Sequence, residues 1–208
     1  IRSIQINVMG EVAVPGTYML SSLSTVFHAL YRAGGVNNIG SLRSIRVMRG
    51  SNCIADLDVY DYILKGKLLD DIRLMEGDVI IVPPYEKLVD ISGKVKRPMY
   101  YEMKKNETLA TLIKYAGGFS GDAYTKGVRL VRQSGREYKL FNIDEMDYSV
   151  FHLDDGDAVT VGSILDRFEN RVEVRGAVYR SGMYELSGNM NTVKQLIQKA
   201  EGLKGDAF

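Results

Sequence analysis

The chain has 208 residues, 45% of them hydrophobic, and its 27 basic and 26 acidic residues nearly cancel. This hydrophobic content is typical of a folded globular protein and argues against a fibrous or disordered chain. The balance is local as well, with nine residues of each sign in 1–88, twelve of each in 89–168, and six basic against five acidic in 169–208. Because nucleic-acid binding depends on an excess of basic residues, we expect no nucleic-acid partner.

Single features of the sequence limit the chemistry further. Cys53 is the sole cysteine, so the chain has no internal disulfide and no thiolate metal cluster; we expect Cys53 to be a small, buried or half-buried apolar residue. The longest apolar run, 79–82, is far shorter than the roughly 18 residues of a membrane helix. The chain begins without Met, and we expect it to be part of a longer protein.

Three copies of one pattern divide the chain. The segments 8–18, 91–101 and 174–184 resemble one another, and the glycine of each lies 83 residues after the previous one. Such regularity predicts tandem structural units. We expect units at 1–88 and 89–168 and an incomplete third at 169–208.

Each copy opens with apolar and polar residues in alternation, as at Ile4, Ile6 and Val8, which predicts a half-buried strand. A glycine and a short polar stretch then predict a turn into a second strand. One aromatic residue occupies the same place on each returning strand: Tyr18, Tyr101 and Tyr184. These tyrosines suit either stacking on sugar rings or packing in a core or domain junction.

A helix is predicted next in every copy, because apolar residues recur at helical spacing. They are Leu23, Val26, Phe27, Leu30 and Ala33, then Leu109, Leu112, Ile113 and Ala116, then Val193, Leu196, Ile197 and Ala200. The candidate N-cap residues are Ser22 or Ser24, Asn106 and Asn191. The first two helices run into Gly-Gly and the third into Glu201-Gly202, so we expect the second of these positions to be left-handed.

The rest of the unit predicts a second hairpin and a closing strand. Strands are expected at 45–49 and 54–59, with equivalents at 128–132 and 138–143, and a short helical or turn element between 61 and 69. Gly-Asp and an apolar strand close each complete copy. The order of hairpin, helix, hairpin and last strand predicts an α+β fold in which a mixed sheet of four or five strands curls around one helix, the β-grasp arrangement.

These motifs resemble the SLBB family, whose name stands for soluble ligand-binding β-grasp. In the first copy they are the opening Gly10 to Tyr18, the helix end Ala33-Gly34-Gly35, and the closing strand Gly77 to Val82. The chain is similar to the tandem SLBB domains of bacterial outer-membrane polysaccharide and capsule export proteins. The resemblance covers nearly the whole sequence.

The resemblance implies a non-catalytic role in the periplasm, associated with the outer membrane, in an oligomeric conduit for capsular or exopolysaccharide. Its implied partners are further copies of the full-length protein, the polysaccharide and an inner-membrane polysaccharide co-polymerase, and it implies no cofactor. Because one fold serves many functions, two alternatives remain: a binding module for a small ligand such as a cobalamin-like molecule, and a structural spacer.

No catalytic or metal site is predicted. His28 is interpreted as a solvated helix residue, and His152 lies beside the acidic turn 154–157, which lacks the ligand spacing of a calcium loop and is typical of a tight turn. The Gly-Gly pairs follow a helix, whereas phosphate-binding glycines precede one. They are therefore interpreted as helix caps.

The charge of the opening hairpin differs between the copies. The first hairpin carries Glu11, and the other two carry basic residues: Lys94, Lys96, Arg97, Arg175 and Arg180. One hypothesis is that these basic tips contact an acidic glycan or a protein partner. The alternative is ordinary solvated charge in a turn.

Overall fold

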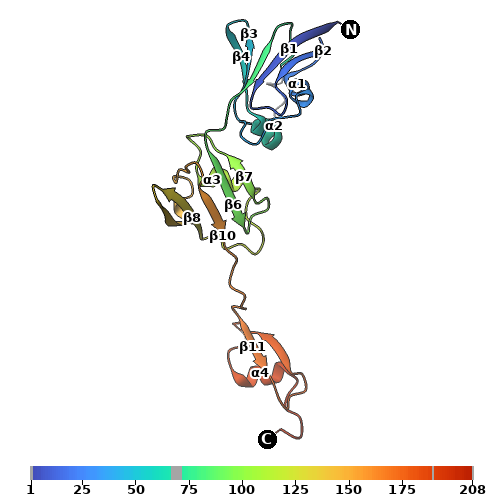
Figure 1. The fold of residues 1–208 in the computed structure, drawn as a ribbon. Coiled ribbons are helices and arrows are strands. Elements are labelled where there is room, and N and C mark those ends of the chain that lie inside the picture. Colours follow the sequence, from blue (N-terminus) through green and yellow to red (C-terminus); the bar gives the residue numbers. More distant parts are fainter. Residues whose placement is uncertain (1, 67–71, 189, 208) are drawn as a thin grey trace. The chain divides into compact units, whose positions relative to one another are not determined.

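The computed structural model describes residues 2–66, 72–188 and 190–207. It forms two compact parts, Ile1–Ile164 and Leu165–Phe208. The first part contains two β-grasp units, each with a five-stranded mixed sheet and its own helix, and the second part contains a two-stranded sheet and a helix (Figure 1). The predicted α+β, tandem β-grasp fold is confirmed.

The first sheet has the strand order β2-β1-β5-β3-β4, in which β1 and β5 are parallel and the other neighbours are antiparallel. Its elements are β1 (Ser3–Gly10), β2 (Gly16–Ser21), α1 (Val26–Arg32), β3 (Ile45–Arg49), β4 (Asn52–Leu57), α2 (Val59–Lys65) and β5 (Val79–Val82). Helix α2 begins the short element expected between 61 and 69, and residues 67–71 of that segment lie outside the described ranges.

The second sheet repeats the same order as β7-β6-β10-β8-β9. Its elements are β6 (Leu88–Gly93), β7 (Met99–Glu102), α3 (Leu109–Tyr115), β8 (Gly127–Ser134), β9 (Glu137–Asp144), the 3-10 turn η1 (Glu145–Asp147) and β10 (Ala158–Val161). The second part, Leu165–Phe208, has β11 (Arg171–Val174), antiparallel to β12 (Gly182–Glu185), and α4 (Val193–Lys199).

Each five-stranded sheet packs one face on its helix and forms a separate core. Strand residues Ile6, Val47 and Ile80 meet Val26 and Leu30 of α1 in the first core. Equivalent residues of β6, β8, β10 and α3 build the second core. The other face of each sheet is open, and most of its side chains are half-buried or exposed.

The helix starts differ from the predicted caps. The N-cap residues are Thr25, Thr108 and Thr192, not Ser22, Ser24, Asn106 or Asn191. Thr192 and Gln195 form a reciprocal capping box, in which each side chain accepts from the other residue's backbone N–H. Leu23 therefore precedes helix α1 and is exposed, because the helix starts one turn later than the apolar stripe indicated.

The opening hairpin turn is bonded to the C-terminal end of the helix in all three copies. The backbone N–H of Val14, Arg97 and Arg180 donates to the carbonyl of Ala33, Ala116 and Ala200 respectively. These bonds satisfy carbonyls that a helix end leaves free. The two residues that follow the C-cap alanine are left-handed in every copy, including Glu201 at φ 62°. The second position is therefore left-handed as predicted, and the first is left-handed as well.

The shared tyrosine fixes the same hairpin. The hydroxyls of Tyr18, Tyr101 and Tyr184 each donate to the carbonyl of the residue four positions earlier. Tyr101 is buried and the other two are partly or largely covered by their own hairpin. The repeated tyrosine thus has a local structural role, and its use in sugar stacking stays untested.

The closing Gly-Asp motif has a buried partner. Asp78 accepts from Nε and Nη2 of Arg49 at 2.8 Å, and Asp157 accepts from the same atoms of Arg132 at 2.9 and 2.7 Å. Both aspartate side chains are fully buried. The acidic turn 154–157 therefore supplies the aspartate of an internal ion pair.

Cys53 is exposed, contrary to the expectation of a buried or half-buried residue. It lies on the edge strand β4, beside a register shift between Val47 and Met48 of the neighbouring strand. Its thiol donates to the carbonyl of Ala55. An edge strand has a free side and a bulge turns its residues outward, which explains the exposure.

Candidate functional site

The predicted basic residues lie in the opening hairpin turns of the second and third copies, and most are paired locally. Lys94 forms an ion pair with Asp122, and Nη2 of Arg97 donates to the carbonyl of Tyr115 at 3.1 Å. In the third copy the two arginines pair with neighbouring glutamates: Arg175 with Glu173 and Arg180 with Glu201. Exposed pairs of this kind reduce the charge offered to a partner, and glycan contact at these turns stays a prediction.

A larger polar cluster joins the two β-grasp units of Ile1–Ile164. We call it the joint; it consists of Ser41, Arg43, Asp58 and Tyr60 from the first unit and Glu102, Lys104, Glu107 and Tyr115 from the second. The contributing segments are the approach to β3, the start of α2, the end of β7 and helix α3. Residues 42 to 72 positions apart in sequence therefore meet here.

Arg43 is the centre of the joint, and its side chain is only 5% exposed. Its Nε donates to both carboxylate oxygens of Asp58 at 2.9 and 3.0 Å. Nη1 and Nη2 bind the two oxygens of Glu107 at 3.0 and 2.9 Å, a bidentate arrangement. Nη1 also donates to the carbonyl of Glu102 at 3.0 Å. Such planar, charge-assisted pairing is the strongest that arginine makes.

Aromatic rings cover the guanidinium. Its central carbon lies 4.4 Å from the ring centroid of Tyr60 and 5.4 Å from that of Tyr115, within the range of a cation–π contact. The two rings meet edge to face at 5.3 Å. Tyr60 and Leu64 of α2 also pack against the core of the second unit. Helix α2 thus belongs to the first unit and covers the second.

Glu102 completes the joint from the other side. Its carboxylate accepts from the Ser41 hydroxyl at 2.6 Å and from the backbone N–H of Leu42 at 2.7 Å. Its own N–H donates to the Tyr60 hydroxyl at 2.8 Å. Among the described residues, no buried side-chain nitrogen or oxygen lacks a hydrogen-bond partner. A fully satisfied polar cluster defines one packing arrangement well.

The joint charges shift one another's pKa values. Burial alone opposes the charge on Arg43, but hydrogen bonds to Glu107 and Asp58 outweigh it and raise the arginine pKa. Burial also opposes the charge of these two carboxylates, while bonds from Arg43 outweigh it and hold both carboxyl pKa values below their ordinary range. Burial and the neighbouring Glu107 raise the pKa of the Tyr115 hydroxyl. Arg43, Asp58 and Glu107 are therefore charged at neutral pH.

Sequence reasoning missed the joint. Its signal was a difference between copies: the second unit has Lys126 at the position of Arg43, and the first has Arg32 at the position of Tyr115. Neither difference indicates which residues contact Arg43 or Tyr115, because those residues are distant in sequence. The structure places Lys126 at the surface, paired with Glu145 at 2.7 Å.

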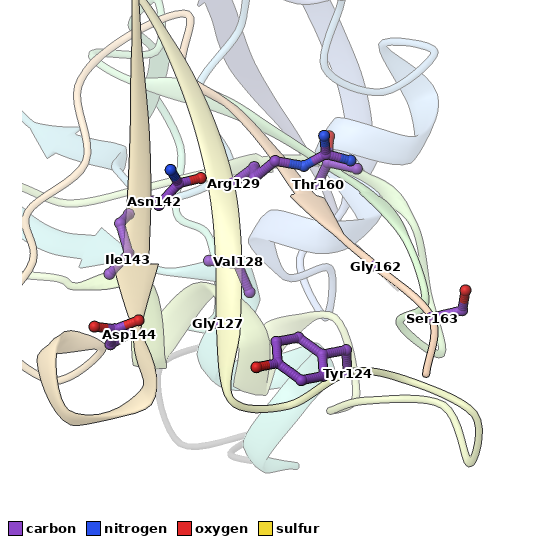
Figure 2. Close-up of a pocket in the computed structure, with 10 residues that line it drawn as sticks. All are labelled: Tyr124, Gly127, Val128, Arg129, Asn142, Ile143, Asp144, Thr160, Gly162 and Ser163. Carbon is purple, nitrogen blue, oxygen red and sulfur yellow. The ribbon is translucent and has the colours of Figure 1, made fainter. Parts of the chain in front are cut away.

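The open face of the second sheet has a polar hollow of about 300 Å³ at one end. In Figure 2 the Arg129 side chain extends from β8 toward Thr160 of β10, while Tyr124 lies below, beside Gly127. Asn142 of β9 pairs with Arg129 across the ladder. The rim also includes Asp144 and Ser163. The hollow offers a cation, an aromatic ring, an amide and hydroxyls on one surface.

Two absences hold for residues 2–66, 72–188 and 190–207. No group of three or more histidine, cysteine, aspartate or glutamate side chains there is arranged to hold a metal ion. No helix in those ranges has the length and apolar character to cross a membrane.

Comparison with known proteins agrees with the fold. Two models of the SLBB domain match the chain, one over residues 5–82 and the other over 88–141. Two curated proteins of Escherichia coli, both named polysialic acid transport protein KpsD, are 25% identical to the chain over 187 residues, which is 89% of this chain and 32% of each relative. The chain therefore spans about a third of the relatives it matches. The matches in both five-stranded units, together with the fold, show that this chain belongs to the SLBB domain family.

Proposed function

We propose that the chain is the SLBB region of a polysaccharide export protein. The observation that carries this proposal is the similarity to the KpsD proteins, which extends over 89% of the chain and therefore beyond the two matched SLBB domains. In this role the chain binds the polysaccharide, shapes the conduit and performs no catalysis. Its substrate is a capsular or exopolysaccharide.

The finer parts of the proposal concern place and assembly. The full-length protein acts in the periplasm in association with the outer membrane, several copies surround a conduit, and an inner-membrane polysaccharide co-polymerase delivers the polymer. The joint supports such a role, because it fixes two β-grasp units as one body. A wall segment that must keep its shape beside a moving polymer benefits from this coupling.

The test uses the bacterium that makes the full-length protein. Deletion of its gene is expected to remove surface polysaccharide and to leave polymer inside the cell. The intact gene restores the surface polymer, and a gene lacking the codons for residues 1–164 does not. Restoration by the shortened gene, at equal protein level on an immunoblot, would contradict the proposed export role.

Assembly and location are tested separately on the full-length protein. Cell fractionation is expected to find it in the envelope, and cross-linking in intact cells is expected to give a ladder that ends at one closed size. A protein that stays monomeric under cross-linking contradicts the conduit, while leaving the export role to the deletion test.

A further inference from the structure

The hollow of the second unit has an equivalent in the first. We call the two the first and second sheet-end hollows. The first is lined by Ser44, Arg46, Asp56, Pro83 and Pro84, and Glu86, Glu102, Lys104 and Lys105 also contribute to it. The second hollow is lined at the matching places by Gly127, Arg129, Asn142, Gly162 and Ser163, and the Asp144 carboxylate lies on its rim.

Strand register shows that the two hollows are built in the same way. Arg46 of β3 lies between Asp56 of β4 and Ile81 of β5. Arg129 of β8 lies between Asn142 and Thr160 of the matching strands. The loop before each arginine-bearing strand is also fixed in the same way. The N–H of Ser41 donates to the carbonyl of Pro83, and the N–H of Tyr124 donates to that of Gly162, both at 2.8 Å. Each hollow is thus preformed.

The two arginines differ from the other cations discussed above. Both are exposed on the open sheet face. Within ranges 2–66, 72–188 and 190–207 neither Arg46 nor Arg129 has an ion-pair partner, although Asp56 lies opposite Arg46 and bonds to the Ser44 hydroxyl instead. An unpaired guanidinium that lines a hollow suits a carboxylate ligand, which it binds with two parallel hydrogen bonds.

The other lining groups indicate the rest of the ligand. Tyr124 is 49% exposed and presents an aromatic ring at the edge of the second hollow. Aromatic faces pack well against the apolar faces of sugar rings. The Asn142 amide and the Thr160 and Ser163 hydroxyls can donate to and accept from sugar hydroxyls. Together these groups match a carboxylate-bearing sugar better than a simple anion.

We infer that the two sheet-end hollows are equivalent subsites for a glycan whose sugars carry carboxylate groups, with Arg46 and Arg129 binding one carboxylate each. The inference rests on the proposed function and adds the chemical class of the polymer and the surface that contacts it. The second hollow binds more tightly, because Tyr124 and Thr160 are replaced by Ser41 and Ile81 in the first, and because Asp56 lies directly opposite Arg46 whereas the neutral Asn142 lies opposite Arg129.

The test is NMR titration of the chain with hexagalacturonate, which has a carboxylate on every sugar. Its fully methyl-esterified form keeps the sugar backbone without the charge, and poly-L-glutamate supplies carboxylates without sugars. Hexagalacturonate is expected to shift the backbone amides around Gly127 and Ser44, in low salt because exposed charge pairs are screened. The two control ligands are expected to bind more weakly at both hollows.

Variants assign the contacts. Arg129→Ala is expected to weaken binding about threefold at the second hollow and leave the first unchanged, and Arg46→Ala to do the reverse, as exposed ion pairs predict. Asp56→Asn keeps the acceptor for Ser44 and is expected to strengthen binding at the first hollow about twofold. The matched control is Arg136→Ala, an exposed arginine in the β8–β9 turn; it leaves both hollows unchanged.

Every other outcome overturns the inference. Absence of shifts, equal binding of the esterified glycan, or equal binding of poly-L-glutamate removes the carboxylate-sugar specificity. An equal loss of glycan binding in Arg136→Ala shows that the glycan is bound by general charge attraction. If the hollows fail this test while the gene lacking residues 1–164 still fails to restore export, the inference falls and the proposed function stands. If that gene restores export, the proposed function falls whatever the titration shows.

Discussion

The first and second β-grasp units have the same interior and different surfaces. In each, a buried aspartate of the closing motif pairs with an arginine, Asp78 with Arg49 and Asp157 with Arg132. The equivalence does not extend to Arg43 and its counterpart Lys126, because Arg43 is buried in the joint and Lys126 lies at the surface. The comparison teaches that buried positions alike in both units maintain the fold, whereas Arg43 and Lys126, which differ, determine what each unit contacts.

The largest effect is expected where both units share a glycine with no room for a side chain. Gly10 and Gly93 have φ of 87° and 83°, and a Cβ on either would lie 2.1 or 2.2 Å from the carbonyl oxygen of Val82 or Val161. Gly10→Ala and Gly93→Ala are each expected to lower the free energy of unfolding by about 3 kcal/mol. Urea denaturation followed by circular dichroism measures the loss.

Gly121→Ala is the matched control, because no atom lies within 4 Å of its Cβ position and its φ is not in the left-handed region. It is expected to change stability by no more than about 0.5 kcal/mol. If Gly10→Ala and Gly93→Ala are as stable as this control, these glycines are not shared for a steric reason.

The second largest effect is expected at Arg43 of the joint, whose counterpart in the second unit is a different residue. Arg43→Met leaves Glu107 without its cation, and loss of one member of a buried pair is expected to cost about 2 kcal/mol, less than for a fully buried pair because Lys104 still neutralises Asp58. Unfolding is also expected to separate into two transitions, since the units lose their coupling. Tyrosine fluorescence follows the joint directly, because Tyr60 and Tyr115 lie in it.

Lys126→Met changes the equivalent position of the second unit. Its exposed ion pair with Glu145 is worth little, so a change within about 0.5 kcal/mol and a single transition are expected. Equal losses for Arg43→Met and Lys126→Met would show that burial in the joint adds no stability.

Much of the fold followed from the sequence because its signals are local and occur three times. Alternating strands, helical stripes and turn glycines each depend on residues close together, and the copies confirm one another. The helix caps failed because Thr25 and Thr108 first form isolated bridges to distant segments, with Arg73 and His152, before the helix begins. Such bridges leave no mark on the local pattern.

The candidate sites were less predictable for the same reason. Arg43 meets Glu107 across 64 positions and Tyr115 across 72, and a basic residue between Leu42 and Ser44 gives no indication of these partners. Arg46 and Arg129 read only as outward-facing strand residues. Their equivalence as hollow-lining residues depends on the neighbouring strands, which the structure supplies.

The smallest expected effect is the pH dependence of the joint. Because Arg43 and its neighbours hold the pKa values of Glu107 and Asp58 below their ordinary 4.5 and 3.8, these carboxylates stabilise the fold above those values, and this stabilisation is lost as pH falls toward the lowered values.

Glu107→Gln keeps the shape and removes one charge. At pH 7 it is expected to be about 1 kcal/mol less stable than the parent chain. That difference should shrink as pH falls below 4.5, because the parent glutamate is then protonated in the unfolded chain and, at its lowered pKa, in the folded chain as well. Comparison of the two proteins cancels the acid sensitivity of the interior pair Arg49–Asp78, whose aspartate pKa is also lowered and which both retain. Urea denaturation at pH 7 and at successively lower pH measures the difference, and a constant difference over this range would show that the carboxylate charge does not stabilise the joint.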